Sequence, residues 1–385
     1  MKKKIPFNKP FISKKSLEYM KKAYGMGNHS GNKYWTEKVI KLIRTQYNLG
    51  ETFLVPSCTA ALEMGAMLVG IKPGDEVIIP SYTFSSTANS VLLFGGIPVF
   101  CDINPLTLNI DPNKIEKLIT KKTKLIIPID YAGVPCEIKK INKIAKKYSI
   151  SVMVDAAQSF GSKINSDEWS GSQADLVAFS FHETKNLSCG EGGALVVNNK
   201  KFIKRAYIVQ EKGTDRRKVI TGMQNKYSWV DYGSSYILSD ILAAIIYGQI
   251  ENQKHIIKCR SNITNCYKKI SKKYDKFLNS INQKYLKSYN HHAYFFLFNK
   301  EKEKINFINN LKNDYSISAY IGYSPLHSSK MGKKLGYKKN DLPITESCAK
   351  RIVRLPVFTD LGCNLEDLNY VNGAIQNTLN KIFNL

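Results

Sequence analysis

The sequence predicts an α/β protein whose large domain contains a mainly parallel seven-stranded sheet. Three observations indicate this fold class: a length of 385 residues, alternating strand-like and helix-like segments over residues 35–200, and a change of pattern after Gly233. A chain of this length is too long for one small core, so we expect a second, smaller α+β domain at the C-terminal end. We place the large domain, with an N-terminal arm, over residues 1–250 and the small domain over residues 251–385.

Seven short runs rich in Val, Ile and Leu are the expected strands of the sheet. They are Phe53–Val55, Glu76–Ile79, Ile97–Cys101, Leu125–Ile129, Ser151–Val154, Leu176–Phe181 and Ala194–Val197. Helical spacing of apolar residues lies between most of them, in Tyr34–Tyr47, Thr59–Val69, Ser85–Phe94, Asn113–Ile119 and Glu137–Tyr148. Strands separated by crossover helices form a parallel sheet that is covered on both faces.

The pattern after Gly233 predicts a different arrangement. Leu238–Lys258 has the spacing of one long helix that leads out of the large domain. The remainder, residues 268–385, contains strand candidates at Ala293–Phe298 and Ser316–Tyr323 among helical segments.

Composition excludes several classes of function. The formal net charge is +26, from 57 basic and 31 acidic residues, but the lysines are spread along the chain beside many Asn and Ile residues. This indicates a compositional bias of the host rather than a nucleic-acid-binding stripe, although a basic surface would attract a phosphorylated small substrate. No window reaches the roughly 18 apolar residues of a membrane helix. The first eight residues are basic without an apolar stretch behind them, so we expect a cytoplasmic protein.

The eight cysteines form no C-x-x-C pair and no regular framework. We therefore expect them to be reduced and to bind no metal, as is typical of a cytosolic chain.

Two residues carry the chemistry that the sequence suggests. Asp155 stands at the carboxyl end of an expected buried strand, and Lys185 lies in a polar, glycine-flanked loop between two strand-like runs. Ligands of open α/β sheets collect at such strand ends. A carboxylate that keeps a pyridine nitrogen protonated and a lysine that forms an imine are what pyridoxal 5'-phosphate (PLP) chemistry requires. The alternatives are a strand-end cap for Asp155 and a solvated loop lysine for Lys185.

Further candidates surround this pair. Ser57 and Thr59 join the first strand to a helix, where backbone N–H groups and hydroxyls form a phosphate cradle, or where the hydroxyls only cap the helix. Ser180 ends a strand and could add a hydroxyl. His182 could contact phosphate or satisfy a buried backbone group. Phe84 could stack on a cofactor ring or belong to the core.

Together these segments closely resemble the DegT/DnrJ/EryC1/StrS family of sugar aminotransferases, which are fold-type-I PLP-dependent transferases. The resemblance covers essentially the whole chain and is carried by residues 5–8, 73–84, 154–158, 180–193, 211–216, 233–236 and 325–327. Within the family, residues 181–186 and 211–216 are typical of the branch that makes dTDP-4-amino-4,6-dideoxygalactose.

The resemblance implies a role for each matching residue. Lys185 would be the Schiff-base lysine and proton shuttle, and Asp155 would pair with the pyridinium nitrogen. The other implied cofactor-binding residues are Gln158 at the phenolic oxygen, Phe84 on the ring, and Ser57, Thr59, Ala60, Ser180 and His182 around the phosphate. Ser235 stands where many members carry an asparagine that reaches the neighbouring subunit's cofactor phosphate. Lys212, Arg216 and His327 would bind the nucleotide sugar.

The resemblance also implies the reaction. L-Glutamate would donate its amino group, through the pyridoxamine 5'-phosphate form of the cofactor, to C4 of a dTDP-linked 4-keto-6-deoxy sugar for surface polysaccharide such as lipopolysaccharide O-antigen. Family members are homodimers with active sites at the interface, and some form larger assemblies. A gluco-forming (viosamine-type) 4-aminotransferase, a 3-aminotransferase and a non-catalytic nucleotide-sugar-binding relative remain open. Sugar dehydration is disfavoured, because dehydrating relatives carry histidine where this chain has Lys185.

Overall fold

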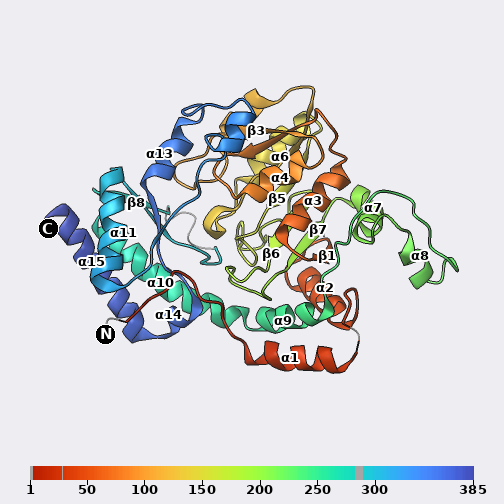
Figure 1. Ribbon diagram of the computed structural model, residues 1–385, viewed down its shortest axis with the longest axis horizontal. Helices are drawn as coiled ribbons and strands as arrows, with labels where there is room; N and C mark the ends of the chain where they lie inside the picture. Colours follow the sequence, from red (N-terminus) through yellow and green to blue (C-terminus); the bar gives the residue numbers. More distant parts are fainter. Residues whose placement is uncertain (1–2, 28, 282–288) are drawn as a thin grey trace.

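A seven-stranded sheet forms the centre of the computed structural model (Figure 1), which describes residues 3–27, 29–281 and 289–385. The strand order is β1-β7-β6-β5-β4-β2-β3. β7 runs antiparallel to both of its neighbours, and the other pairs are parallel. The strands are β1 (Glu51–Val55), β2 (Glu76–Pro80), β3 (Ile97–Cys101), β4 (Thr123–Ile126), β5 (Ser151–Asp155), β6 (Leu176–Ser180) and β7 (Gly193–Val197). The predicted mainly parallel sheet of seven strands is confirmed.

Helices cover both faces of this sheet, because successive strand residues point to opposite sides. In β5, Val152 and Val154 pack in one hydrophobic cluster and Met153 in the other. The first layer contains α2 (Tyr34–Gln46), α6 (Ile138–Lys147) and α9 (Asp240–Glu251). The second contains α3 (Cys58–Val69), α4 (Ser85–Leu92) and α7 (Lys200–Gln210). The strands are therefore buried on both faces, which explains their nearly continuous apolar sequences.

Two elements of this region depart from the prediction by more than one or two terminal residues. β4 ends at Ile126, because Pro128 has no N–H group to donate to a strand ladder; Ile129 forms only a single bridge, to Asp155. The helix expected at Asn113–Ile119 is a short α5 (Pro112–Ile115) followed by the 3₁₀ helix η1 (Glu116–Leu118).

The prediction of one helix over Leu238–Lys258 is wrong. α9 ends at Glu251, and a separate α10 (Gln253–Lys273) follows after Asn252. The Asn252 side chain donates hydrogen bonds to the Gly248 carbonyl (2.7 Å) and to Ser13 Oγ (2.9 Å), which fixes the joint. Apolar spacing continues through this joint, so the sequence pattern gives no sign of it.

A second, antiparallel sheet of four strands follows, in the order β10-β11-β9-β8. Its strands are β8 (Leu278–Ser280), β9 (Phe295–Phe298), β10 (Tyr320–Ile321) and β11 (Ile352–Arg354). The strand expected at Ala293–Phe298 is confirmed, but Ser316–Tyr323 contains only the two residues of β10. β8 and β11 were not predicted, and residues 282–288 of the expected α+β region lie outside the described residues, as do Met1 and Lys2 of the basic N-terminus.

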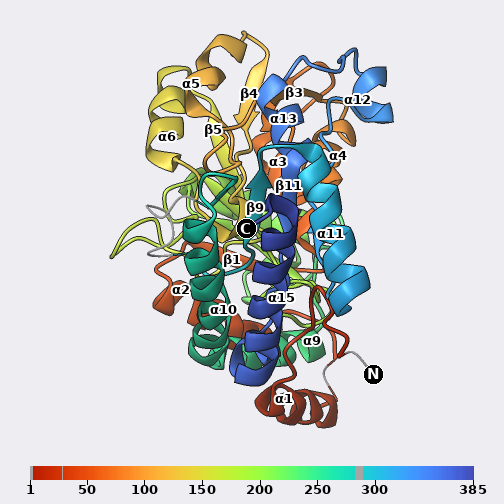
Figure 2. The same cartoon turned by 90° about the vertical axis from the view of Figure 1, so that its left-hand side faces the viewer.

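Helices of the C-terminal region pack over this second sheet. α15 (Leu365–Phe383) lies between α10 and α11 (Glu301–Tyr315) in Figure 2. The remaining helices are α1 (Lys14–Gly25), α8 (Arg216–Ile220), α12 (Lys330–Lys334), α13 (Pro343–Arg351), α14 (Thr359–Cys363) and the 3₁₀ helix η2 (Tyr131–Gly133). The domain boundary near residue 250 stays a prediction. Among the described residues, no helix is both long and apolar enough to cross a membrane.

The segment of residues 3–13, the N-terminal arm, runs from the second sheet to α9. Ile5 exchanges backbone hydrogen bonds with Ser316 (3.1 Å) and Ser318 (3.0 Å), and the Phe7 ring packs edge-on against Tyr320 at 4.8 Å. Further along, the Phe11 carbonyl accepts a hydrogen bond from Gln249 of α9. The arm therefore connects the small sheet to the helix layer of the large one.

A disulfide joins Cys259 of α10 to Cys363 of α14. This corrects the expectation that all eight cysteines are reduced. The two residues are 104 positions apart, so their spacing could not reveal the pair. The six other cysteines are free thiols: Cys58, Cys101, Cys136, Cys189, Cys266 and Cys348.

Candidate active site

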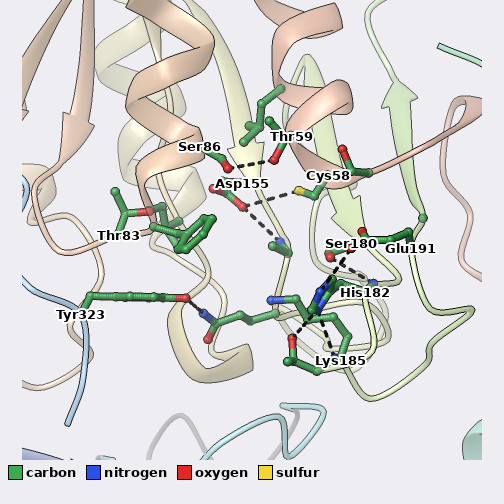
Figure 3. Close-up of a pocket in the computed structure, with 18 residues that line it drawn as sticks. Cys58, Thr59, Thr83, Ser86, Asp155, Ser180, His182, Lys185, Glu191 and Tyr323 are labelled. Carbon is green, nitrogen blue, oxygen red and sulfur yellow. Dashed lines mark hydrogen bonds and ion pairs between the residues drawn. The ribbon is translucent and has the colours of Figure 1, made fainter. Parts of the chain in front are cut away.

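A cavity of about 340 Å³ opens at the carboxyl ends of the central strands. Asp155 and Ser180 are the last residues of β5 and β6, and Lys185 follows β6 in the next loop. In Figure 3 these side chains approach one space from different elements. Eight of the candidates predicted from the sequence line this cavity: Ser57, Thr59, Phe84, Asp155, Gln158, Ser180, His182 and Lys185.

Asp155 is a buried carboxylate with neutral hydrogen-bond donors. Thr87 Oγ1 donates to Oδ2 at 2.7 Å, and the Ala157 backbone N–H donates to Oδ1 at 3.2 Å. Burial raises the pKa of Asp155, while these hydrogen bonds and the charge of Lys185 act in the opposite direction. No cation in the described part of the chain forms an ion pair with it. A positively charged ring nitrogen would supply the missing partner.

Lys185 is placed by a tightly bonded loop. Its N–H donates to the His182 carbonyl at 2.9 Å, and the neighbouring Asn186 side chain donates to the Asn290 carbonyl at 2.7 Å. Burial lowers the pKa of Lys185, and the adjacent Cys58 and Asp155 partly oppose that shift. The Lys185 amine has no hydrogen bond or ion pair with any described residue. An amine with a lowered pKa is unprotonated in a larger fraction of molecules than an ordinary lysine, so more of it is available as a nucleophile or general base.

Hydroxyl groups gather at the start of α3. Ser57 Oγ accepts from the Ala60 N–H at 3.1 Å, so Ser57 is a helix cap, and it also lines the cavity. Thr59 Oγ1 lies 2.8 Å from Ser86 Oγ. Ala60 itself is buried and is not among the lining residues. A helix N-terminus with hydroxyls beside it favours a phosphate group.

Close backbone packing keeps this turn next to the start of β7. A Cβ atom on Gly193 would lie 2.5 Å from the Ser57 carbonyl carbon, so only glycine fits there. The strand order β1-β7-β6 therefore brings Ser57 and Ser180 to the same end of the cavity.

Gln158 and Phe84 form other walls. Gln158 Oε1 accepts from the Ala132 N–H at 2.7 Å, and Nε2 donates to the Tyr323 hydroxyl at 3.0 Å. Phe84 precedes α4 and is 59% exposed at the cavity, so the alternative that it belongs to the core is wrong.

His182 lines the cavity and also satisfies a backbone group. Its Nδ1 accepts from the Thr184 N–H at 3.2 Å, while Nε2 lies 3.4 Å from a Glu191 carboxylate oxygen. The ring therefore presents an N–H on the Nε2 side.

Besides Ala60, four predicted residues do not line the cavity of their own chain. His327 is fully buried, with Nδ1 2.7 Å from Ser81 Oγ and Nε2 3.3 Å from Glu346. Ser235, Lys212 and Arg216 are exposed.

Sequence reasoning missed Thr87, Tyr323 and Arg354. Thr87 lies one helical turn after Phe84, and this spacing could have indicated that both face one site. Tyr323 and Arg354 come from the C-terminal region, and nothing in the local pattern connects them with Lys185.

Arg354 lines a second cavity, of about 150 Å³, that shares Gln158, Thr184, Lys185 and Tyr323 with the first. Its buried Nε has no hydrogen-bond partner within the described ranges, and its guanidinium carbon lies 5.3 Å from the centre of the Phe7 ring. None of the described residues that line this cavity carries a carboxylate. Burial lowers the pKa of the adjacent His292, so Arg354 is the permanent cation of this cavity. The cavity suits a small anion.

Comparison with known proteins agrees with this geometry. The model of the DegT/DnrJ/EryC1/StrS aminotransferase family matches residues 30–376. The uncharacterized protein MJ1066 of Methanocaldococcus jannaschii is 34% identical over 319 residues, which cover 80% of this chain and 82% of that protein. The spore coat polysaccharide biosynthesis protein SpsC of Bacillus subtilis is 28% identical over 380 residues, 93% of each chain.

Solved structures show the same fold. The sugar aminotransferase Spr1654 of Streptococcus pneumoniae, in its PMP form, has a TM-score of 0.89 at 24% identity and covers 98% of this chain and 100% of its own. Helicobacter pylori PseC, an aminotransferase of pseudoaminic acid biosynthesis, has a TM-score of 0.88 at 22% identity, with coverage of 98% and 100%.

Proposed function

The chain belongs to the DegT/DnrJ/EryC1/StrS aminotransferase family, and from this premise we propose that it transfers the amino group of L-glutamate to C4 of a dTDP-linked 4-keto-6-deoxy sugar. The product would be dTDP-4-amino-4,6-dideoxygalactose. As a family member the chain is a PLP-dependent sugar aminotransferase.

One observation carries the proposal: Asp155 and Lys185 line one cavity, and neither forms an ion pair with any residue that the structure describes. The cavity fits PLP in three respects. Within the described residues, Asp155 lacks the cation that a ring nitrogen would provide, and the amine of Lys185 has no partner. The hydroxyls of Ser57 and Thr59 at the start of α3 and of Ser180 at the end of β6 line the same cavity. These residues would hold the ring nitrogen, the aldehyde carbon and the phosphate respectively.

When bound, PLP supplies a carbonyl that accepts the amino group and a cationic ring that stabilises negative charge on the adjacent carbon. Asp155 favours the charged form of the ring nitrogen by Coulombic pairing. Lys185, with its lowered pKa, can take the proton from the amino donor's α-carbon and return one to C4 of the sugar. Gln158, held by Ala132 and Tyr323, offers an oriented amide to the ring.

Arg354 supports an amino acid as the donor. A carboxylate in the second cavity would meet the guanidinium of Arg354, which forms no ion pair with a described residue, and would place its α-carbon near Lys185, which lines both cavities. Burial of a guanidinium without an anion is costly, so an α-carboxylate would stabilise the site as well as being bound by it.

We further propose a homodimer in which Ser235, Lys212 and Arg216 act toward the partner's site. In Figure 1, α8 lies on a segment that projects away from the rest of the chain. Large apolar side chains on this segment are exposed, namely Ile220 (70%), Met223 (78%) and Trp229 (79%). Exposed apolar patches of this kind are typical of protein interfaces.

Product analysis tests the reaction. The holoenzyme is incubated with L-glutamate and dTDP-4-keto-6-deoxyglucose, and the product is examined by NMR. An axial amine at C4 supports the proposed product, whereas an equatorial amine would indicate the viosamine-type enzyme. Loss of a hydroxyl would indicate dehydration, and tight binding without turnover would indicate a non-catalytic relative. We propose that the amino sugar is used in surface polysaccharide such as lipopolysaccharide O-antigen, in keeping with the description of SpsC.

A further inference from the structure

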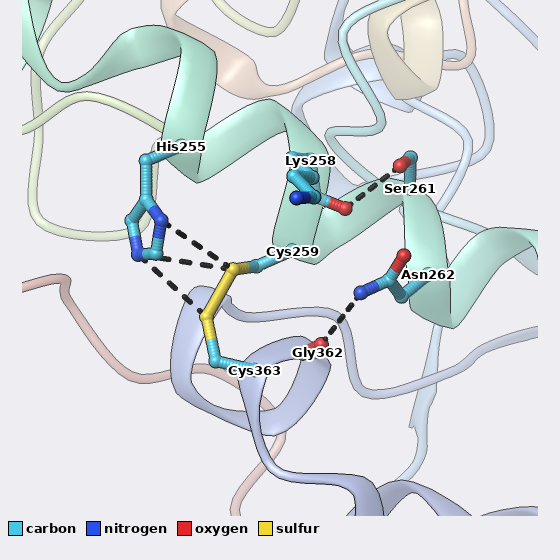
Figure 4. Close-up of a disulfide and its surroundings, with 7 residues drawn as sticks. All are labelled: His255, Lys258, Cys259, Ser261, Asn262, Gly362 and Cys363. Atoms are coloured by element: carbon cyan, nitrogen blue, oxygen red, sulfur yellow. Dashed lines mark hydrogen bonds between the residues drawn. A yellow bond between two sulfur atoms is a disulfide. The ribbon is translucent and has the colours of Figure 1, made fainter.

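A second cluster of reactive side chains lies between α10 and α14, apart from the cavities described above (Figure 4). His255 and Cys259 stand one turn apart on α10, and Cys363 is the last residue of α14. His255 Nε2 lies 3.8 Å from Cys259 Sγ and 3.7 Å from Cys363 Sγ. Cys259 is buried, while His255 and Cys363 are exposed. No other cluster of three His, Cys, Asp or Glu side chains at metal-ligand spacing occurs among the described residues.

The distances from His255 Nε2 to the two sulfur atoms are close to those in a zinc site. In a tetrahedral zinc site, Zn–S bonds of about 2.3 Å and Zn–N bonds of about 2.05 Å place nitrogen about 3.6 Å from each sulfur. The two distances from Nε2 already approach this value. Only the sulfur–sulfur separation differs, because the sulfurs are bonded to each other; in a zinc site it is about 3.8 Å.

The histidine ring is available for this role. Its contacts with polar atoms in the described part of the chain are those with the two sulfurs. The Phe11 ring packs beside it, with the ring centroids 5.7 Å apart. Asp360, which precedes Cys363 in α14, is paired with Lys9 at 2.7 Å. Because the Asp360 carboxylate already has this partner, we do not count it as a ligand. The fourth ligand would then be a water molecule on the exposed side of the cluster.

We propose that reduction of the Cys259–Cys363 disulfide creates a binding site for one Zn²⁺ ion, held by both thiolates and by His255 Nε2. A dithiol reductant of the thioredoxin class breaks the S–S bond by supplying two electrons and two protons, and is itself oxidised to a disulfide. Zinc then displaces the two thiol protons and takes a water as its fourth ligand. The covalent tether between α10 and α14 is replaced by a coordinate one.

Metal content of the holoenzyme tests the proposal. Protein is treated with a phosphine reductant, incubated with Zn²⁺ alone, desalted and assayed by atomic spectroscopy, beside a sample kept oxidised. We expect one zinc per chain in the reduced sample and none in the oxidised sample. Competition with a chelating dye should show affinity more than about a hundredfold weaker in His255→Ala and Cys363→Ser, since loss even of outer-shell partners costs 10–100-fold.

Cys266→Ser is the matched control, because Cys266 is a free thiol on the same helix outside the cluster. It should bind zinc as the unmodified protein does. His255 is exposed, so its alanine variant should fold, which is checked by the visible absorption of the bound cofactor. An absence of zinc in the reduced protein would overturn the proposal, as would equal zinc affinity in His255→Ala, Cys363→Ser and Cys266→Ser.

Discussion

Asp155 and Lys185 face the same cavity without forming an ion pair with each other. Both belong to the described part of the chain, and each is influenced by the other's charge. A carboxylate and an amine that met directly would neutralise each other and leave neither free for a ligand. Their separation across the cavity allows each to act on a different atom of a bound ring.

Replacing Lys185 by alanine should abolish turnover while preserving cofactor binding. Asp155, Phe84 and the hydroxyls near α3 remain, so pyridoxamine phosphate should still bind. The rate should fall by about 10³-fold or more, because no other described amine is placed to move the proton. The measurement is steady-state turnover together with bound cofactor on one sample, and exposed Lys143→Ala serves as the control. Activity near that of the unmodified enzyme would show that Lys185 is an ordinary loop lysine.

Asp155→Asn should weaken cofactor binding and should also make that binding independent of pH in the acid range. Burial raises the pKa of Asp155, so in the free protein its carboxyl group takes up a proton at a higher pH than an ordinary aspartate. Cofactor binding needs the charged carboxylate, and it should weaken as the pH falls through this raised pKa. The asparagine variant carries no such group, and its weaker binding should be flat over the same range. The measurement is cofactor release, followed by absorbance as a function of pH, in the unmodified enzyme and in Asp155→Asn. If the two proteins release the cofactor with the same pH dependence, that dependence belongs to a group other than Asp155.

Arg354→Gln should affect the amino donor selectively. Loss of one charged hydrogen-bonding partner costs about 1.5–3 kcal/mol, which corresponds to about a 10- to 150-fold rise in KM for L-glutamate. The KM for the keto sugar should change little. Lys350→Gln, which removes an exposed cation from the preceding helix, is the control. A rise confined to the sugar would place the nucleotide, rather than the amino acid, at Arg354.

Trp229→Glu should disrupt the proposed homodimer. A charge placed in an apolar interface is costly to bury, so light scattering should show a shift toward monomer. Activity should fall with it, because Ser235 and Lys212 would no longer reach a partner's site. Leu365→Glu changes another exposed apolar residue (71%, against 79% for Trp229), at the start of α15, and should leave the assembly intact. A dimer that survives Trp229→Glu with full activity would contradict the proposed interface.

Much of the fold could be predicted from the sequence, because a short run of apolar residues is enough to indicate a buried strand. Val152 to Val154 read as a buried strand from their composition alone, and Asp155 follows directly. The α9–α10 joint was missed because Asn252 acts through its side-chain hydrogen bonds and leaves the apolar spacing unbroken. Arg354 and the Cys259–Cys363 pair depend on the folding together of distant segments, which no local pattern records.

The position of Lys185 between two cavities has a kinetic consequence. The amino acid and the keto sugar would both require the same amine, so they cannot be processed together in one active site. Each should leave before the other reacts, which gives parallel lines in double-reciprocal plots of initial rate against either substrate. At high concentration each substrate should also inhibit the enzyme, because it can bind to the cofactor form of the enzyme with which the other substrate reacts.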